Sequence, residues 1–259
     1  MKRRHLFPAA LAASALGASG LTGCAGPQPL PPLTQLPNDR QLVLGPTADL
    51  DPRRLPSGWS LVAPERAAEI AVTSQSGRPV LSLSAPGGAA LVRQFNIPLT
   101  AAPGLEWSWK LESAAFGGGP GDGLARGLRL IIGFSGGGSP DLIAPQRWMR
   151  SYAGFPPHDR RIEISFGGTA TSRSELVSTE LAATAEVGTR RVLRAPAQGL
   201  TGGWISEFVD VLALYRGFFT QDRFAEVTFA FVAIGALPAR LPDGIASTIG
   251  HVVEIQVFK

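Results

Sequence analysis

The residues around Cys24 indicate a specific chemistry for this side chain, which is true of no other residue in the sequence. It follows Leu21, Thr22 and Gly23, the order of residues in a lipobox. The thiolate is the nucleophilic form of cysteine, and here it would receive a diacylglycerol group. Cleavage before Cys24 would free its amine for a further acyl chain such as palmitate. Two or three chains form a stable membrane anchor, because each buried CH₂ contributes about 0.8 kcal/mol.

The residues before Cys24 fit an exported chain. A basic start, Lys2-Arg3-Arg4, precedes an apolar stretch from residue 6 to about residue 20. Basic, apolar and small residues in this order describe a bacterial secretory signal. The stretch is short for a transmembrane helix, which needs about 20 predominantly apolar residues. We therefore expect residues 1–23 to be a lipoprotein signal peptide. Plain secretion and an uncleaved anchor are the alternatives.

Two carboxylates, Glu207 and Asp210, lie three residues apart in a segment whose apolar residues recur at helical spacing. Residues 204–215 are therefore predicted to form one helix of about three turns. Paired carboxylates hydrolyse glycosides when they flank a bond at about 5 to 9 Å. No pattern in the sequence places these two across a cleft. We favour polar ligand contacts for them, together with Tyr215, over catalysis.

A glycine-rich loop at 117–127 carries a second pair of charged residues, Asp122 and Arg126. It lacks the lysine, the serine or threonine and the following helix that a phosphate loop needs. It supplies one carboxylate, whereas calcium takes several oxygen ligands. Asp122 is therefore expected to pair with Arg126, and a ligand contact is the alternative.

Ser135 lies in Gly133-Phe134-Ser135-Gly136-Gly137, which matches the G-x-S-x-G pattern of hydrolases. A nucleophile elbow needs a helix directly after the serine, but Gly138-Ser139-Pro140 follows. A glycine-rich hairpin loop is the better interpretation. After the signal, only His158 and His251 remain as histidines, so a zinc site of histidine and cysteine is not expected. The sequence predicts no metal and no cofactor.

The composition favours strands and excludes a nucleic-acid binder. The chain has 24 basic and 20 acidic residues, and loss of Lys2-Arg3-Arg4 with the signal leaves 21 and 20. No basic block remains, so the electrostatic footprint of a nucleic-acid binder is absent. Glycine accounts for 31 of 259 residues and charged residues for 17%. That balance suits strands joined by many turns rather than a helical bundle.

Hydrophobic alternation with a period of two recurs from about Leu42 onward. The predicted strands are 105–111, 128–132, 162–166, 227–233 and 253–257, with shorter ones at 70–73, 80–84, 90–97 and 190–194. Trp107 and Trp109 share a face with two leucines, so we expect them in the core rather than stacked on a ligand. Short strands separated by Gly and Pro turns predict a mostly-β fold, an antiparallel β-sandwich of jelly-roll, galactose-binding-like type with one packed helix.

The predicted organisation is simple. Residues 24–43 are expected to be the lipidated cysteine and a Pro-rich tether, and residues 44–259 a single domain. Ala25, rather than an aspartate, follows the cysteine. In Gram-negative sorting this favours the periplasmic face of the outer membrane over retention at the inner membrane.

Four stretches fit a common pattern in order and spacing. They are Trp107-Ser108-Trp109-Lys110-Leu111, residues 121–126, Gly203-Trp204 with Glu207, Asp210 and Tyr215, and the closing strand 249–257. Together they resemble a family of bacterial proteins known as domain of unknown function 3047, over residues 44–259. The chain departs from that family at Gly123, at Leu214 and at 245–248, where relatives tend to carry acids. The resemblance implies an exported β-rich domain of unknown activity, with any acidic site thinned.

A non-catalytic binding module at the cell envelope is the leading functional hypothesis, with a glycan or another envelope component as ligand. Its expected contacts are Asp122, Arg126, Glu207, Asp210 and Tyr215. An assembly lipoprotein acting through a protein partner is the first alternative, and exposed apolar residues around Phe218, Phe219 and Phe224 would favour it. A carboxylate-based polysaccharide hydrolase is the second, and it requires Glu207 or Asp210 to face another acid across a cleft.

Overall fold

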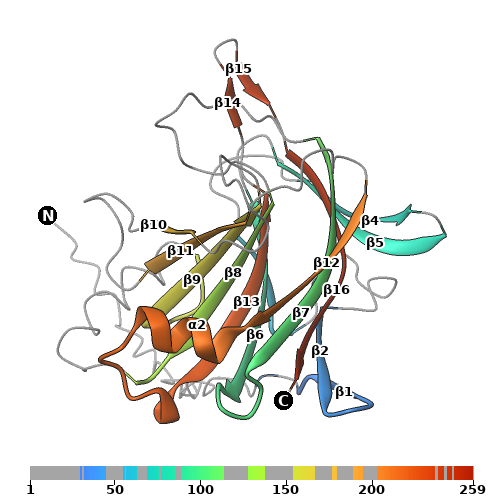
Figure 1. Cartoon of the computed structure of the whole chain (residues 1–259). Coiled ribbons are helices and arrows are strands. Elements are labelled where there is room, and N and C mark those ends of the chain that lie inside the picture. Colours follow the sequence, from blue (N-terminus) through green and yellow to red (C-terminus); the bar gives the residue numbers. More distant parts are fainter. Residues whose placement is uncertain are drawn as a thin grey trace, which may run out of the picture.

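Two β-sheets packed face to face make up most of the described part of the molecule (Figure 1). The structure is a computed structural model. It describes residues 30, 32–44, 55, 57–62, 69–75, 77–85, 89–113, 128–137, 154–166, 177–179, 189–194, 203–236, 239–241, 244–246 and 248–258. No helix within these ranges is long and apolar enough to span a membrane.

Sheet A is built around one long strand. Its members are β1 (Thr34–Leu36), β2 (Arg40–Leu44), β4 (Glu69–Gln75), β5 (Arg78–Ala85), β7 (Gly104–Ser113), β12 (Trp204–Asp210) and β16 (Thr248–Phe258). On one side, β16 pairs with β7; on the other, its first half pairs with β5 and its second half with β2. β12 pairs with the far side of β7 and is an edge strand among the described ones.

Sheet B follows a different order. From edge to edge it runs β10 (Val177–Thr179), β11 (Thr189–Arg194), β9 (Arg160–Phe166), β8 (Leu128–Ser135), β13 (Thr228–Ala236), β6 (Ala89–Pro98) and β3 (Trp59–Val62). β14 (Ala239–Leu241) and β15 (Gly244–Ala246) form a separate pair. The helix α2 (Val211–Phe218) directly follows β12, and a short 3-10 turn, η2 (Phe224–Glu226), precedes β13.

The predicted fold class is confirmed as a mostly-β antiparallel sandwich of jelly-roll type with one helix. One pairing departs from it, because β11 lies parallel to β9. The nine predicted strands all correspond to observed ones, and the last is longer than predicted because β16 starts at Thr248. Its pairing with β7 contains two register shifts.

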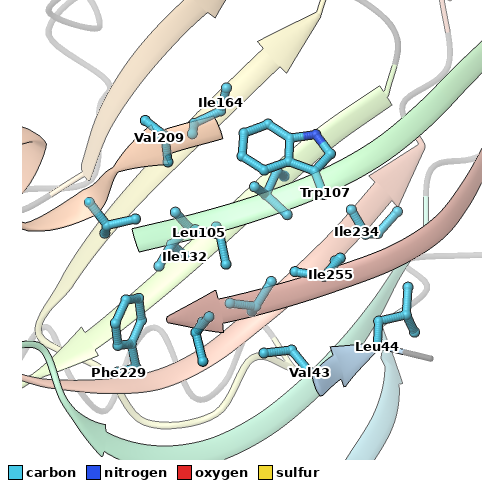
Figure 2. Close-up of a cluster of buried hydrophobic side chains, with 14 of the residues drawn as sticks. Val43, Leu44, Leu105, Trp107, Ile132, Ile164, Val209, Phe229, Ile234 and Ile255 are labelled. Carbon is cyan, nitrogen blue, oxygen red and sulfur yellow. The ribbon is translucent and has the colours of Figure 1, made fainter. Parts of the chain in front are cut away.

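The core lies between the sheets, where inward residues of both meet (Figure 2). Val43 from β2 and Ile255 from β16 face Phe229 and Ile234 from β13 across this space. Trp107 is 1% exposed and lies in the same cluster as Trp109, so the prediction that both tryptophans are core residues is confirmed. Each large apolar side chain that is fully buried contributes about 1.5–3 kcal/mol.

A second, smaller cluster covers the outer face of sheet B. Phe231 from β13 is fully buried there and packs with Val92 from β6 and Ile131 from β8. Phe155 stacks on the Phe231 ring with 5.5 Å between centroids. Gly133 faces the same ring, and a Cβ at this position would overlap the Phe231 side chain. Glycine is therefore required at residue 133 by close packing.

The predicted helix at 204–215 is wrong in its first half. Residues 204–210 form β12, in which exposed and buried residues alternate strictly, and the helix begins only at Val211. Sheet pairing decides the outcome, because all seven residues of β12 bond to β7 without a register shift. The helix is therefore a short extension of an edge strand.

The predicted tether also ends earlier than residue 43. β1 and β2 form a hairpin, β2 pairs with β16, and Leu33 and Val43 are buried in the core. Asn38 and Asp39 take positive φ in the turn, a conformation these two residue types tolerate. The folded domain therefore includes part of the segment assigned to the tether.

Gly133→Ala is expected to lower the free energy of unfolding by about 1–3 kcal/mol, because the added methyl overpacks the buried Phe231 ring. Gly217→Ala in α2 is the matched control, since a Cβ there meets nothing within 4 Å. Alanine in a helix should leave stability unchanged or raise it by up to about 1 kcal/mol. Denaturant unfolding of both variants checks this, and equal stabilities would contradict the packing argument.

Candidate binding face

β12 presents aromatic side chains to the outside of sheet A. Trp204 is 39% exposed and Phe208 is 54% exposed, whereas Ile205 and Val209 between them are buried in the core. Successive side chains on a strand point to opposite faces. The residues at 204, 206, 208 and 210 therefore share the outer face.

Polar residues of β7 lie beside these aromatic rings. In the antiparallel register, Lys110 is opposite Trp204, Ser108 is opposite Ser206, and Glu106 is opposite Phe208. The two serine hydroxyls are 3.0 Å apart. The pair of serines thus lies between the cross-strand pair that contains Trp204 and the one that contains Phe208.

Phe258 extends the aromatic surface across β7. Its ring centroid is 5.5 Å from that of Phe208, although Gly104 of β7 lies between the two strands. A Cβ on Gly104 would be 2.7 Å from the Phe258 ring, so the glycine leaves room for the ring to lie over the strand. We call the set Trp204, Ser206, Phe208, Ser108 and Phe258 the aromatic face.

Arg40 of β2 fixes the far end of the aromatic face. Its guanidinium lies over the Phe258 ring, 5.3 Å from the centroid. It also forms a 3.1 Å ion pair with Glu106 and donates to Gln256 Oε1 at 3.2 Å. Both partners of the ion pair are more than a third exposed, so the pair adds little to the free energy of unfolding. Its main effect is to hold the Arg40 side chain in position.

Glu207 and Asp210 do not form a pair. Glu207 is 6% exposed and points toward the interior, while Asp210 is exposed on the outer face. Asp210 is the N-cap of α2, where its Oδ1 accepts a 2.8 Å hydrogen bond from the Ala213 backbone N–H. Carboxylates on opposite faces of one strand cannot flank one glycosidic bond, so the paired-carboxylate arrangement is contradicted.

Tyr215 belongs to a buried network rather than to an open site. It is fully buried, and its hydroxyl donates a 2.8 Å hydrogen bond to Asp222 Oδ2. Arg160 donates to both oxygens of Asp222 at 2.7 Å and lies over the Phe219 ring. Burial, followed by the hydrogen bond and charge of Asp222, raises the pKa of Tyr215 above its usual range. The network ties α2 and the following turn to β9.

The remaining predicted contacts, Asp122 and Arg126, lie outside the described residues. Among the described ones, Glu207, Asp210 and Tyr215 occupy three separate environments and do not converge. Of the phenylalanines whose exposure would favour a protein partner, Phe219 is buried. Phe224 is 39% exposed with Arg216 over its ring.

Ser135 ends β8 and behaves as a loop residue. Its hydroxyl donates to the Pro157 carbonyl at 3.4 Å, and Nδ1 of His158 lies 2.7 Å from the Pro156 carbonyl. Gly136, with φ of 85°, donates its N–H to Asp159 Oδ2 at 2.7 Å. Serine and histidine thus each contact a backbone carbonyl, in keeping with the predicted glycine-rich loop. The described residues hold no group of three or more metal-ligating side chains.

Sequence reasoning missed the aromatic face. The helical spacing of residues 204, 208, 211, 212 and 215 placed Trp204 and Phe208 on one face of the predicted helix. The available signal was the alternation Trp204-Ile205-Ser206-Glu207-Phe208-Val209-Asp210, with Ile205 and Val209 as its buried members. Glu207 lies on the same inward face. Because it is charged, the inward residues do not form an uninterrupted apolar series, and the alternation was not recognised.

Neither a protein-family model nor a curated protein matches the chain. Among solved structures, the chain is similar to endoglucanase 3 of family GH12 from Trichoderma harzianum, at 7% identity and TM-score 0.41, covering 78% of this chain and 91% of that one. It is also similar to a native family 12 xyloglucanase from Bacillus licheniformis, at 10% identity and TM-score 0.37, covering 89% and 97%.

Asp222→Ala is expected to lower the free energy of unfolding by about 3–5 kcal/mol, because it leaves the half-buried Arg160 and the buried Tyr215 hydroxyl without their shared acceptor. Glu226→Ala is the control. Its pair with Arg223 is exposed, so the loss should stay below about 1 kcal/mol. Denaturant unfolding measures both, and a small effect of Asp222→Ala would mean that the network is not stabilising.

Proposed function

We propose that this protein is a lipid-anchored, non-catalytic binding module of the bacterial cell envelope that binds a glycan on its aromatic face. The proposal is carried mainly by the outward placement of Trp204 and Phe208 on one strand. Large aromatic side chains usually lie in the core, so exposed aromatic residues on one face of a sheet indicate an interaction surface. No catalytic residue, metal or cofactor is part of the proposal.

The chemistry of the aromatic face suits a sugar better than a fully apolar partner. Aromatic rings can stack on the C–H faces of sugars, and the hydroxyls of Ser108 and Ser206 can both donate and accept hydrogen bonds. Glu106, Lys110 and Gln256 surround these groups with further polar atoms. A few placed polar groups around an apolar platform are typical of ligand sites.

Part of the platform is held in place by contacts within the protein. Phe258 lies between Phe208 and Arg40, and its strand pairs with β2 on one side and with β7 on the other. A ligand that binds such a surface does not have to order it first. Residues on strands hold positions more precisely than residues on loops.

Lipidation of Cys24 would hold the aromatic face close to a membrane. Leu33 already belongs to the core and lies nine positions after Cys24. The intervening chain can reach at most about 32 Å at 3.6 Å per residue. With Ala25 next to the cysteine, we place the domain at the periplasmic face of the outer membrane. Envelope polysaccharides within that reach are the proposed ligands.

An assembly role through a protein partner is the second candidate. Phe224 favours it, because this ring lies on η2 rather than on a strand of the aromatic face and is exposed with Arg216 over it. Exposed aromatic and arginine residues are enriched at protein interfaces. Capture of one defined envelope protein that is lost in Phe224→Ala would favour this candidate.

Trp204→Ala is expected to weaken glycan binding at least about tenfold, which corresponds to about 1.4 kcal/mol. Leu61→Ala is a matched control, because Leu61 is also exposed but lies on β3 of sheet B. A glycan array followed by calorimetry measures both, with the detergent-solubilised full chain in a detergent that has no sugar headgroup. Equal binding by the two variants, or none by the unaltered protein, would refute the proposal.

Cys24→Ser is expected to release the protein from membranes or to leave the precursor uncleaved, because serine cannot supply the thiolate that accepts the lipid. Membrane fractionation and the mass of the N-terminal peptide check this. An unchanged membrane fraction with normal processing would refute the anchor, whatever the result of the glycan measurements.

A further inference from the structure

We propose that the ligand of the aromatic face is an extended, uncharged polysaccharide that lies along β12. This inference rests on the proposed function and specifies the length, direction and charge of the ligand. Three features of the described residues carry it: the spacing of the rings, the contents of the rows between them, and the balance of charges around them.

The ring spacing sets the length of the ligand. Trp204 and Phe208 are four residues apart on one strand, which at about 3.3 Å per residue separates their Cα atoms by about 13 Å. This is longer than one sugar ring, so a monosaccharide can touch only one of the two side chains. A ligand that uses both must be an oligomer.

The row between the rings sets the direction. Ser206 and Ser108 lie side by side midway between Trp204 and Phe208. Because their side chains are short, they leave space for a ligand between the two aromatic residues. Across the strands, the path beyond Phe208 is occupied by the Phe258 ring and by Arg40 above it. A ligand lying along β12 meets ring, hydroxyls and ring in turn, whereas one lying across the strands does not.

The charges of the described side chains on this face balance, which points to an uncharged ligand. The cations are Lys110 and Arg40 and the anions are Glu106 and Asp210, counted among the outward side chains that the structure describes on β2, β7, β12 and β16. Arg40 pairs with Glu106, Lys110 donates to Gln75 Oε1 at 3.4 Å, and Asp210 caps α2. Because each charge already has a partner within the protein, an acidic sugar would gain little here.

The test is a titration of the detergent-solubilised full chain with linear oligosaccharides of neutral sugars, from the monosaccharide to the hexasaccharide. A polyuronic acid of similar length is the charged comparison. We expect at least a tenfold rise in affinity between the monosaccharide and the hexasaccharide. We expect Phe208→Ala to remove most of that rise. Leu61→Ala should keep the full length dependence.

Salt provides the second measurement. Between about 0.01 and 1 M salt the Debye length falls from about 30 Å to about 3 Å, so charge-driven binding weakens while stacking persists. We expect affinity for the neutral hexasaccharide to change less than about twofold over this range.

The outcomes separate this inference from the proposed function. Equal affinity for the monosaccharide and the hexasaccharide would overturn the extended ligand while leaving glycan binding standing. Preference for the polyuronic acid with steep salt dependence would overturn the uncharged ligand. Absence of binding to every glycan would overturn both proposals.

Discussion

The pairing of β16 with strands on both of its sides is the constraint on which the rest of the structure depends. This one strand bonds to β7 along its length, to β5 through its first half and to β2 through its second half. Without it, sheet A would separate into unconnected pairs, because no other described strand joins β7 to β2 or β5. The same strand carries Val252, Ile255 and Val257 into the core.

That constraint also creates the candidate binding face. Because β16 holds β7 in place, β12 can pair with the far side of β7 at the sheet edge and point Trp204 and Phe208 outward. The last residue of β16 in the sheet, Phe258, then reaches across Gly104 to the ring of Phe208. Core packing and surface chemistry are therefore products of the same register: inward residues of these strands fill the sandwich, and outward residues supply the rings and hydroxyls.

The strands were predictable where one face is wholly apolar. In β7, Leu105, Trp107 and Trp109 alternate with polar residues, and the structure buries them as period-two reasoning requires. The same reasoning failed for β12, because its inward face contains Glu207 and its outward face contains two aromatic residues. The order of polar and apolar residues alone then indicates helical spacing instead of strand alternation. The structure resolves the ambiguity through hydrogen bonds to β7, a partner almost a hundred residues earlier that local pattern cannot reveal.

The candidate site was harder to predict for a related reason. A pair of acids three residues apart suggests shared chemistry only if the backbone is helical, and on a strand the same spacing sends them to opposite faces. Tyr215 attracted attention as a polar aromatic residue, but its hydroxyl is committed to Asp222. The residues that do gather outside, Phe208 and Phe258, are fifty positions apart and meet only after the sheet has formed.

The place of β16 in the sequence has a consequence for how the molecule is made. It follows every other described strand of sheet A, and its contact between Arg40 and Gln256 joins residues 216 positions apart. Contacts so distant are slow to form, because a long loop must close before any bonding energy is recovered. Until β16 is in place, the edges of β2, β5 and β7 that it covers lack this partner. In that state the uncovered strand edges can pair with those of neighbouring chains. The chain therefore needs protection from aggregation until β16 has paired.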